Sequence, residues 1–496
     1  MYAPRKKVFW FAITTRIVIL VLQVIFNVLV PDHHADAFKR PLDSTDQVSL
    51  CDQIIYFLFN GLTRWDGEYF LHIARYGYTY ENTLAFYPLY PAMIRIIAVI
   101  LTKIFPLFNI QSTMIIAAIL INFICFVKSA IIFYDLTKRV FQNTVTAYKA
   151  AILYCINPAS IFFSALYSES MFAYLTFYTM LGSIECISNI YFPLALSTLV
   201  RSNGIVNIGF PIYFRLKNLV NLGNSERMEK TNGQKHDVLS NLWYILKLIK
   251  LKSCFIILST MIISLSPFVL LQIYNYMKFC TSTFDKSLLP VHILQYAMEN
   301  NLILPGKTDS IWCNASVPLA YSYVQNTYWN VGFLRYYQFK QIPNFILALP
   351  ILYITLQCIK EFACEYRDEL YLLGFFDSKA KSESAIKVKK YPSSMLVFVV
   401  HGLFLTMFCL FFVHIQVSTR LLASATPLIY WYCALAMSHK YDHIDQYESD
   451  ENMCSKWKVF FLSQQRYTLQ DKFVLFYFVG YTIVGCFMFS NFLPWT

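Results

Sequence analysis

The chain has 496 residues, of which 57% are hydrophobic and only 14% are charged, whereas a soluble domain carries about 25% charged residues. This composition excludes a soluble globular protein and predicts a polytopic membrane protein. The net charge of +12 would suggest nucleic-acid binding in a soluble protein, but here the basic residues gather in a few loops, where they typically mark the cytosolic side of a membrane. We therefore expect the lipid bilayer as a partner, and no nucleic acid.

About eleven apolar segments follow one another along the chain. A membrane span needs roughly 20 apolar residues, so the segment 91–107, which also contains Arg95 and Lys103, is the weakest of them. The sequence predicts an all-α bundle of about eleven crossings, within a range of nine to eleven, and a single multi-pass domain over residues 1–496. The segments lie near residues 8–30, 91–107, 110–134, 147–166, 170–190, 192–213, 253–277, 342–358, 395–415, 420–437 and 473–490.

Three basic residues, Arg5, Lys6 and Lys7, precede the first apolar segment. Because positive charges tend to remain in the cytosol, we expect a cytosolic N-terminus and a luminal loop at 31–90. The segment is too long for a cleaved signal peptide, and it lacks the small-residue cleavage site of one.

The other polar stretches agree with this orientation. The 278–341 loop is poor in basic residues and contains Asn314-Ala315-Ser316, the only glycosylation sequon of the chain, so we expect it to be luminal and Asn314 to be glycosylated. We expect the loops 215–252, 359–392 and 438–472 to be cytosolic. The first of these holds eight Lys and Arg residues against three acids.

Thirteen cysteines are present, mostly inside apolar segments, where a cysteine behaves as a small hydrophobic residue. The absence of a Cys-x-x-Cys pair argues against a zinc or redox motif. Cys51, Cys280 and Cys313 fall in the two loops that we expect to be luminal. They could supply one disulfide, but the sequence does not choose the partners.

A pair of acids in the 31–90 loop is the first candidate for an active site. Asp66 and Glu68 directly follow Trp65, and carboxylates in such hydrophobic proteins are usually functional. A carboxylate at the membrane surface can take the proton of a sugar hydroxyl. Asp66 could instead cap a helix that begins at Gly67, and Trp65 could be an interfacial anchor.

The neighbours of Asp66 have alternative interpretations as well. On a helix Glu68 would point away from Asp66, whereas on a strand both would share a face, so Glu68 is either an acceptor-binding residue or a solvated charge. His72 lies four residues after Glu68, and we expect it to pair with that carboxylate rather than to bind a metal.

Glu169 lies in a polar break, Tyr167–Ser170, between two apolar segments. Strict alternation of the crossings places this break on the cytosolic side, where Glu169 would belong to a simple connecting turn. If 91–107 is instead a half-helix in the membrane interface, Glu169 faces the same luminal cavity as Asp66. Arg95 and Lys103 favour this second arrangement.

Several stretches resemble one known family. They are WDGEYFLHIARYGY and AFYPLYP in the 31–90 loop, NPASIFFSALYSESMFA (157–173), RSNG (201–204), VQNTYWNVGFLRYYQFKQIPNFILALP (324–350), HIQVSTRLLASATPLIYW (414–431) and the terminal NFLPWT. Together they resemble the PIG-V family, the GPI mannosyltransferase 2 enzymes. The resemblance covers the chain nearly end to end and in the expected order.

The resemblance implies a GT-C-like glycosyltransferase of the endoplasmic reticulum membrane with its active site in luminal loops. Members of the family transfer the second mannose, through an α-1,6 linkage, from dolichyl-phosphate-mannose to a GPI-anchor precursor. In GT-C enzymes an acidic residue of the first luminal loop contacts the acceptor or acts as the base, and Asp66 occupies that place. We expect neither a metal nor another cofactor. The sequence leaves open whether a small membrane subunit is required.

The chemistry of this transfer indicates which further residues to consider. A β-linked donor that gives an α-linked product undergoes inversion, which needs one base and no covalent intermediate. The departing phosphate needs cationic or hydrogen-bonding groups, which basic residues of the matched segments could supply. Beside Asp66 and Glu68 as catalytic candidates, the residues that we expect to bind substrate are Trp65, Glu169, Arg201, Trp329, Asn330, Lys340 and Arg420.

Two other function classes stay open on the sequence pattern alone. A lipid flippase or solute transporter should place its ionisable residues near the middle of the bilayer and show internal repeats, and no repeat is visible. A non-catalytic membrane subunit would not need the acidic loop around Asp66.

Overall fold

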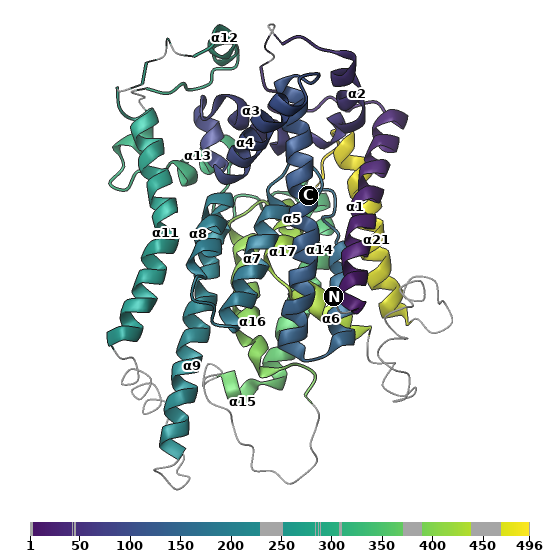
Figure 1. Ribbon diagram of the computed structural model, residues 1–496, viewed down its shortest axis with the longest axis vertical. Coiled ribbons are helices and arrows are strands. Elements are labelled where there is room, and N and C mark those ends of the chain that lie inside the picture. Colours follow the sequence, from purple (N-terminus) through teal and green to yellow (C-terminus); the bar gives the residue numbers. More distant parts are fainter. Residues whose placement is uncertain are drawn as a thin grey trace.

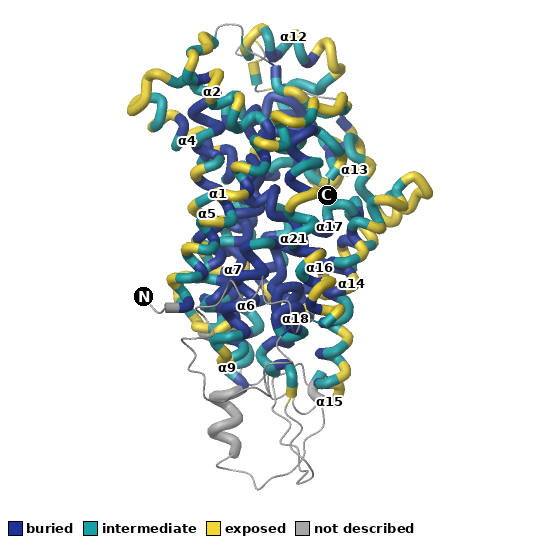
Figure 2. Tube along the Cα trace, turned by 90° about the vertical axis from the view of Figure 1, so that its right-hand side faces the viewer, coloured by how far each residue is buried: buried dark blue, intermediate teal, exposed yellow. Residues whose placement is uncertain are grey.

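The computed structural model describes residues 3–41, 43, 46–228, 251–282, 284–285, 287, 289–306, 310–370, 389–437 and 468–495. Within these residues the chain forms helices and no strand, as the composition predicts. The long helices run side by side along the long axis, and several short helices gather at the upper end of the bundle (Figure 1). The axis of the bundle is buried and the exposed residues lie on its outside and at its ends (Figure 2).

Six helices of the described chain are long and apolar enough to cross a membrane. The other apolar segments form helices that are shorter or broken, so the predicted number of crossings is not confirmed. The six helices are α1 (Ala3–Leu29), α5 (Ile110–Phe141), α11 (Leu251–Phe279), α14 (Ile342–Glu365), α16 (Leu396–Phe411) together with the 3-10 turn that precedes it (Ser393–Met395), and α21 (Leu469–Ser490).

Three segments that we expected to be continuous are interrupted. The segment 147–166 forms α6 (Thr144–Cys155), and irregular turns then lead to α7 (Glu169–Ile184). The segment 192–213 is divided into α8 (Tyr191–Val200), the 3-10 turn η3 (Ser202–Ile208) and α9 (Gly209–Met228). The segment 420–437 is divided into α17 (Ser418–Ala425) and α18 (Leu428–Ala436).

Two of these breaks have a local cause in the sequence. Pro427 stands two residues after the end of α17, and a proline lacks the N–H that would continue the helix. Gly204 lies so close to α8 that a Cβ atom there would stand 2.4 Å from the carbonyl oxygen of Ser197. A glycine therefore allows η3 to fold back against α8.

The third break is held by a buried arginine of α1. The guanidinium of Arg16, which is only 1% exposed, donates hydrogen bonds to the carbonyl oxygens of Cys155 at 3.0 Å and Ser160 at 2.8 Å. It also stacks on the ring of Phe126, with its central carbon 3.8 Å from the ring centre. Since buried carbonyl groups need partners, Arg16 allows α6 to end inside the bundle.

Five short helices gather at one end of the bundle, at the top of Figure 1. Among them α4 has 16 residues, includes the weak segment 91–107 in part, and packs against α3 and α5. At the opposite end lie the far end of α9 and the short α15 (Arg367–Leu370). The five helices are α2 (Leu50–Phe59), α3 (Asp66–Tyr76), α4 (Leu89–Ile104), α12 (Val291–Glu299) and α13 (Ala320–Trp329).

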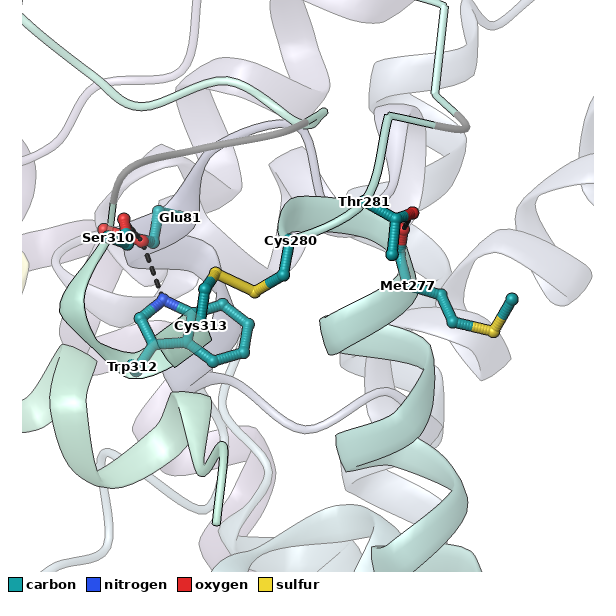
Figure 3. Close-up of a disulfide and its surroundings, with 7 residues drawn as sticks. All are labelled: Glu81, Met277, Cys280, Thr281, Ser310, Trp312 and Cys313. Atoms are coloured by element: carbon teal, nitrogen blue, oxygen red, sulfur yellow. Dashed lines mark hydrogen bonds between the residues drawn. A yellow bond between two sulfur atoms is a disulfide. The ribbon is translucent and has the colours of Figure 1, made fainter. Parts of the chain in front are cut away.

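A disulfide closes part of the 278–341 loop on itself, and a buried carboxylate of the 31–90 loop fastens that part in place (Figure 3). Cys280, which follows α11, is bonded to Cys313, and Cys51 is free. Beside this bond lies Glu81, which is fully buried. One oxygen of its carboxylate accepts hydrogen bonds from Ser310 Oγ at 2.5 Å and from Trp312 Nε1 at 2.9 Å. The other oxygen accepts a hydrogen bond at 3.0 Å from the hydroxyl of Tyr328, which belongs to α13.

The loops 215–252, 359–392 and 438–472 lie largely outside the described residues. Where the chain is described, two of their boundaries differ from the expectation, because α9 continues to Met228 and α14 continues to Glu365.

Candidate functional site

A cavity of about 530 Å³ lies where the interrupted helices meet the short helices of the loops. Its walls come from α3, α7, α13, α17 and the turn that follows α8. Many of its lining residues belong to segments that the sequence marks as candidates. They include Trp65, Asp66, Tyr69, Glu169, Arg201, Trp329 and Arg420.

Four charged side chains form a connected row along this cavity. Arg420 Nη1 lies 2.7 Å from Asp66 Oδ2 and 3.9 Å from Glu169 Oε1. Arg201 forms an ion pair with the same oxygen of Glu169. The side chain of Glu169 is 1% exposed, those of both arginines are 17% exposed and that of Asp66 is 31% exposed. The row contains two carboxylates and two guanidinium groups, so their formal charges cancel.

The breaks in the helices place three of these four residues. Glu169 is the first residue of α7, Arg201 directly follows α8, and Arg420 lies in the first turn of α17. Continuous membrane-spanning helices would have spread these side chains along the bundle. The interruptions bring them to one cavity, together with Asp66 at the beginning of α3.

A tyrosine aligns Asp66 with α7. The backbone N–H of Asp66 donates to the hydroxyl of Tyr167 at 3.0 Å, and Tyr167 stands two residues before Glu169. Asp66 is itself the first residue of α3, and Trp65, in the N-cap position with φ of 57°, makes no side-chain cap bond. The interpretation of Asp66 as the cap of a helix beginning at Gly67 is therefore wrong, and its carboxylate is turned to Arg420 instead.

The charge of Arg420 is maintained by its neighbours. Burial alone would lower the pKa of this guanidinium, but the nearby carboxylates of Asp66 and Glu169 outweigh that effect and raise the pKa above its usual value. The central carbon of the guanidinium lies 5.4 Å from the ring centres of both Phe162 and Tyr167. Arg420 is thus a permanent cation held over two aromatic rings.

Glu68 does not line this cavity. Its carboxylate lies 3.4 Å from the guanidinium of Arg40, on a different side of α3 from Asp66, as a helical spacing of two residues requires. His72 does not pair with Glu68, contrary to the expectation. Its Nε2 lies 2.6 Å from Thr79 Oγ1, and burial lowers the pKa of His72 to about 3, so the imidazole is neutral.

Two other candidates also lie outside the cavity lining. Lys340 is exposed in η6 (Phe339–Gln341). Asn330 ends α13 in a left-handed conformation, with φ of 52°, and its Oδ1 lies 3.5 Å from Arg335 Nη1. Trp329, directly before it, does line the cavity.

Tyr321 and Gln325 also line the cavity and were missed in the sequence. Together with Trp329 they are spaced by four residues along α13, so all three lie on one helix face. That spacing is visible in the sequence, and it would have identified the face once a short helix was expected there. His414 and Gln416, near Arg420, complete this side of the cavity.

The described residues contain no group of three or more His, Cys, Asp and Glu side chains that could hold a metal ion. What the cavity offers is one partly exposed carboxylate beside two permanent cations, with aromatic rings around them. Such an arrangement can accept a proton at one point and stabilise an anion at a neighbouring point.

Comparison with known proteins agrees with this chemistry. Residues 5–496 match the family described as Mannosyltransferase (PIG-V). The chain is 34% identical to GPI mannosyltransferase 2 of Drosophila melanogaster, over 99% of this chain and 100% of that one. It is 34% identical to GPI alpha-1,6-mannosyltransferase 2 of Cricetulus griseus and 32% identical to that of Homo sapiens, in both cases over 99% of each chain. The chain therefore belongs to the PIG-V family of mannosyltransferases.

Proposed function

We propose that this protein adds a mannose to a GPI-anchor precursor through an α-1,6 linkage, in the membrane of the endoplasmic reticulum. Dolichyl-phosphate-mannose is the donor, and the precursor with one mannose is the acceptor. The names of the full-length relatives support the reaction. The observation that supports the site is the row of Asp66, Arg420, Glu169 and Arg201 in one cavity.

Asp66 is the general base in this proposal. It takes the proton of the acceptor hydroxyl as that oxygen forms its bond to the anomeric carbon of the donor mannose. The bond between this carbon and the phosphate oxygen breaks, and its electron pair remains on the phosphate. The configuration is inverted, because the attack and the departure take place on opposite faces of the sugar.

Arg420 and Arg201 stabilise the phosphate. A phosphodiester that becomes a monoester gains negative charge, and guanidinium groups are well suited to bind it with paired hydrogen bonds. Both arginines are partly buried, so their attraction to an anion is less screened than in water. Glu169 is a positioning residue that keeps the two cations side by side.

Aromatic side chains of the cavity would bind the sugars. Tyr69 and Trp329 both line it, and their ring centres lie 6.0 Å apart. Tyr69 is itself stacked on Phe86, with ring centres 4.5 Å apart, so its ring is held in place. A rigid aromatic face offers apolar contact to a sugar ring at low entropic cost.

The short helices around the cavity belong to the luminal side in this proposal. The beginning of α1, with Arg5, Lys6 and Lys7, points towards the opposite end of the bundle (Figure 1). This arrangement supports a cytosolic N-terminus by the distribution of positive charge, and it supports a GT-C-like site on the luminal face.

The function can be tested in cells that lack the second GPI mannosyltransferase. Expression of this protein should restore GPI-anchored proteins at the cell surface and remove the accumulated one-mannose precursor. A well-expressed protein that leaves the precursor unchanged would contradict the proposal and favour a transporter or a non-catalytic subunit.

The sequon at Asn314 provides a test of the orientation. Asn314 is exposed at the end of η5 (Ile311–Asn314), so we expect one N-linked glycan, and a glycosidase should increase the electrophoretic mobility of the protein. The substitution Asn314→Gln should give the same mobility without the enzyme. Labelling of a cysteine introduced at Asn314 from the cytosolic side of sealed microsomes would contradict the luminal assignment.

A further inference from the structure

We propose that the phosphate of the donor releases Asp66 from Arg420, so that the base becomes available to the acceptor only after the donor has bound. This inference rests on the proposed function and adds an order of binding to it. Arg420 acts as the movable part, and Glu169 fixes the place to which it can move.

The carboxylate of Asp66 is engaged by a side chain of the protein itself. Its Oδ2 accepts a charge-assisted hydrogen bond from Arg420 at 2.7 Å, and bonds of this kind are roughly twice as strong as neutral ones. An acceptor hydroxyl that approaches Asp66 must compete with this guanidinium. The arrangement therefore disfavours productive binding of the acceptor alone.

Arg420 has hydrogen-bonding capacity that the protein does not use. Its Nε is buried and has no hydrogen-bond partner, and Oε2 of Glu169 is also buried without one. Buried polar atoms are nearly always paired in folded proteins, and two unpaired atoms of opposite character in one row leave the site incomplete. A ligand that supplies acceptor oxygens would satisfy Arg420.

The unused donor of Arg420 makes an anion the ligand that suits this row. Asp66 and Glu169 otherwise balance Arg420 and Arg201.

 The two carboxylates and two guanidinium groups leave no net charge. A phosphodiester adds one negative charge, and it is attracted to whichever guanidinium can turn towards it. Arg201 is held by Glu169, whereas Arg420 is shared between two carboxylates at 2.7 and 3.9 Å, so Arg420 is the one that can turn.

Glu169 makes this movement possible at low cost. When Arg420 leaves Asp66 it stays within reach of Glu169 Oε1, so the cation does not become isolated in a partly buried site. Asp66, with a side chain that is 31% exposed, is then free to accept the hydrogen bond of the acceptor hydroxyl. After transfer, the hydroxyl proton is on Asp66, and the phosphate monoester, with its added negative charge, lies against Arg420.

The proposal predicts a coupling between the two substrates that a binding experiment can measure. The probes are a soluble short-chain polyprenyl phosphate, which has no mannose to transfer, and the one-mannose acceptor glycolipid. The affinity of the purified protein for the acceptor should increase at least about 5-fold when the polyprenyl phosphate is present, which is the lower end of typical coupling between two sites. By linkage, the acceptor should increase the affinity for the phosphate by the same factor.

Two substitutions should remove this coupling in different ways. Arg420→Gln removes the cation that moves, and Asp66→Asn removes the carboxylate that holds it, so in both variants the affinity for the acceptor should be the same with and without the phosphate. Arg95→Gln is the matched control, because Arg95 is exposed on α4 and lies outside the cavity lining. This variant should keep the coupling of the unchanged protein.

Two results would overturn the proposal. One is an acceptor affinity of the unchanged protein that does not depend on the polyprenyl phosphate. The other is a coupling that persists in whichever of Arg420→Gln and Asp66→Asn folds. Absence of mannose transfer by the unchanged protein would instead contradict the proposed function, so the two failures are distinguishable.

Discussion

The substitution Asp66→Asn is expected to reduce mannose transfer by about 10²–10⁴-fold, which is the usual contribution of a general base. Asparagine keeps the size of the side chain but cannot take the proton of the acceptor hydroxyl. Accumulation of the one-mannose precursor in cells that carry only this variant measures the loss. The amount of folded protein should barely change, because asparagine still offers an oxygen to Arg420, and Arg420 keeps the carboxylate of Glu169 at 3.9 Å.

Glu68→Gln is the matched control for this experiment. Glu68 lies two residues away on the same helix but pairs with Arg40, outside the cavity. We therefore expect this variant to retain most of the transfer activity. Near-normal conversion of the precursor by Asp66→Asn would remove Asp66 from the role of base.

The substitution Glu81→Ala is expected to detach one wall of the cavity. It leaves Ser310, Trp312 and the half-buried Tyr328 without their acceptor. Ser310 and Trp312 are buried, and each buried donor that loses its partner costs about 1–3 kcal/mol. Tyr328 belongs to α13, so this helix should lose its fixed position against the 3-10 turn η2 (Glu81–Ala85). We expect a lower temperature of unfolding and a severe loss of transfer activity.

Thermal unfolding and limited proteolysis of the purified protein measure this effect. The loop 281–310 should be cleaved faster in Glu81→Ala than in the unchanged protein. Glu81→Gln is the matched control, because it keeps one oxygen acceptor and nearly the same volume, and its defect should be clearly smaller. Equal proteolysis of Glu81→Ala and the unchanged protein would show that Glu81 does not hold the loop.

The helical class and the acidic loop could be predicted from the sequence, whereas the way in which the chain turns between α6 and α7 could not. Hydropathy identifies apolar residues, and the irregular turns at 156–168 are as apolar and as buried as a helix. The carbonyl groups of Cys155 and Ser160 are satisfied by Arg16, more than 130 residues earlier in the chain. A local pattern contains no sign of such a distant partner, so the segment 147–166 was predicted as one span.

For the site residues too, the sequence identifies candidates but not their contacts. Asp66 and Arg420 stand in stretches that attract attention by their charge in an apolar chain, but their ion pair joins residues 354 positions apart. Glu68 and Lys340 have similar charge and similar neighbours in the sequence, and the fold turns them away from the cavity. Charge and motif therefore identified the candidates, and only the packing of α3, α7 and α17 distinguished between them.

Glu81 shows what a sequence pattern does not reveal. It is a single acid in an unremarkable stretch of the loop, and its three partners lie more than 220 residues later in the chain. Likewise, the three loop cysteines allowed three pairings, and the choice of Cys280 with Cys313 depends on how the loop folds.

The buried Arg16 also sets a condition on how the protein is made. α1 is synthesised before α6, and the carbonyl groups that satisfy Arg16 follow about 140 residues later. Until they arrive, α1 holds a charge that costs about 2.5–3.5 kcal/mol at the centre of a membrane helix. α1 is therefore less stable in lipid alone than with α6 and its following turns packed against it. The hydrogen bonds of Arg16 thus join two segments that are synthesised at well-separated times.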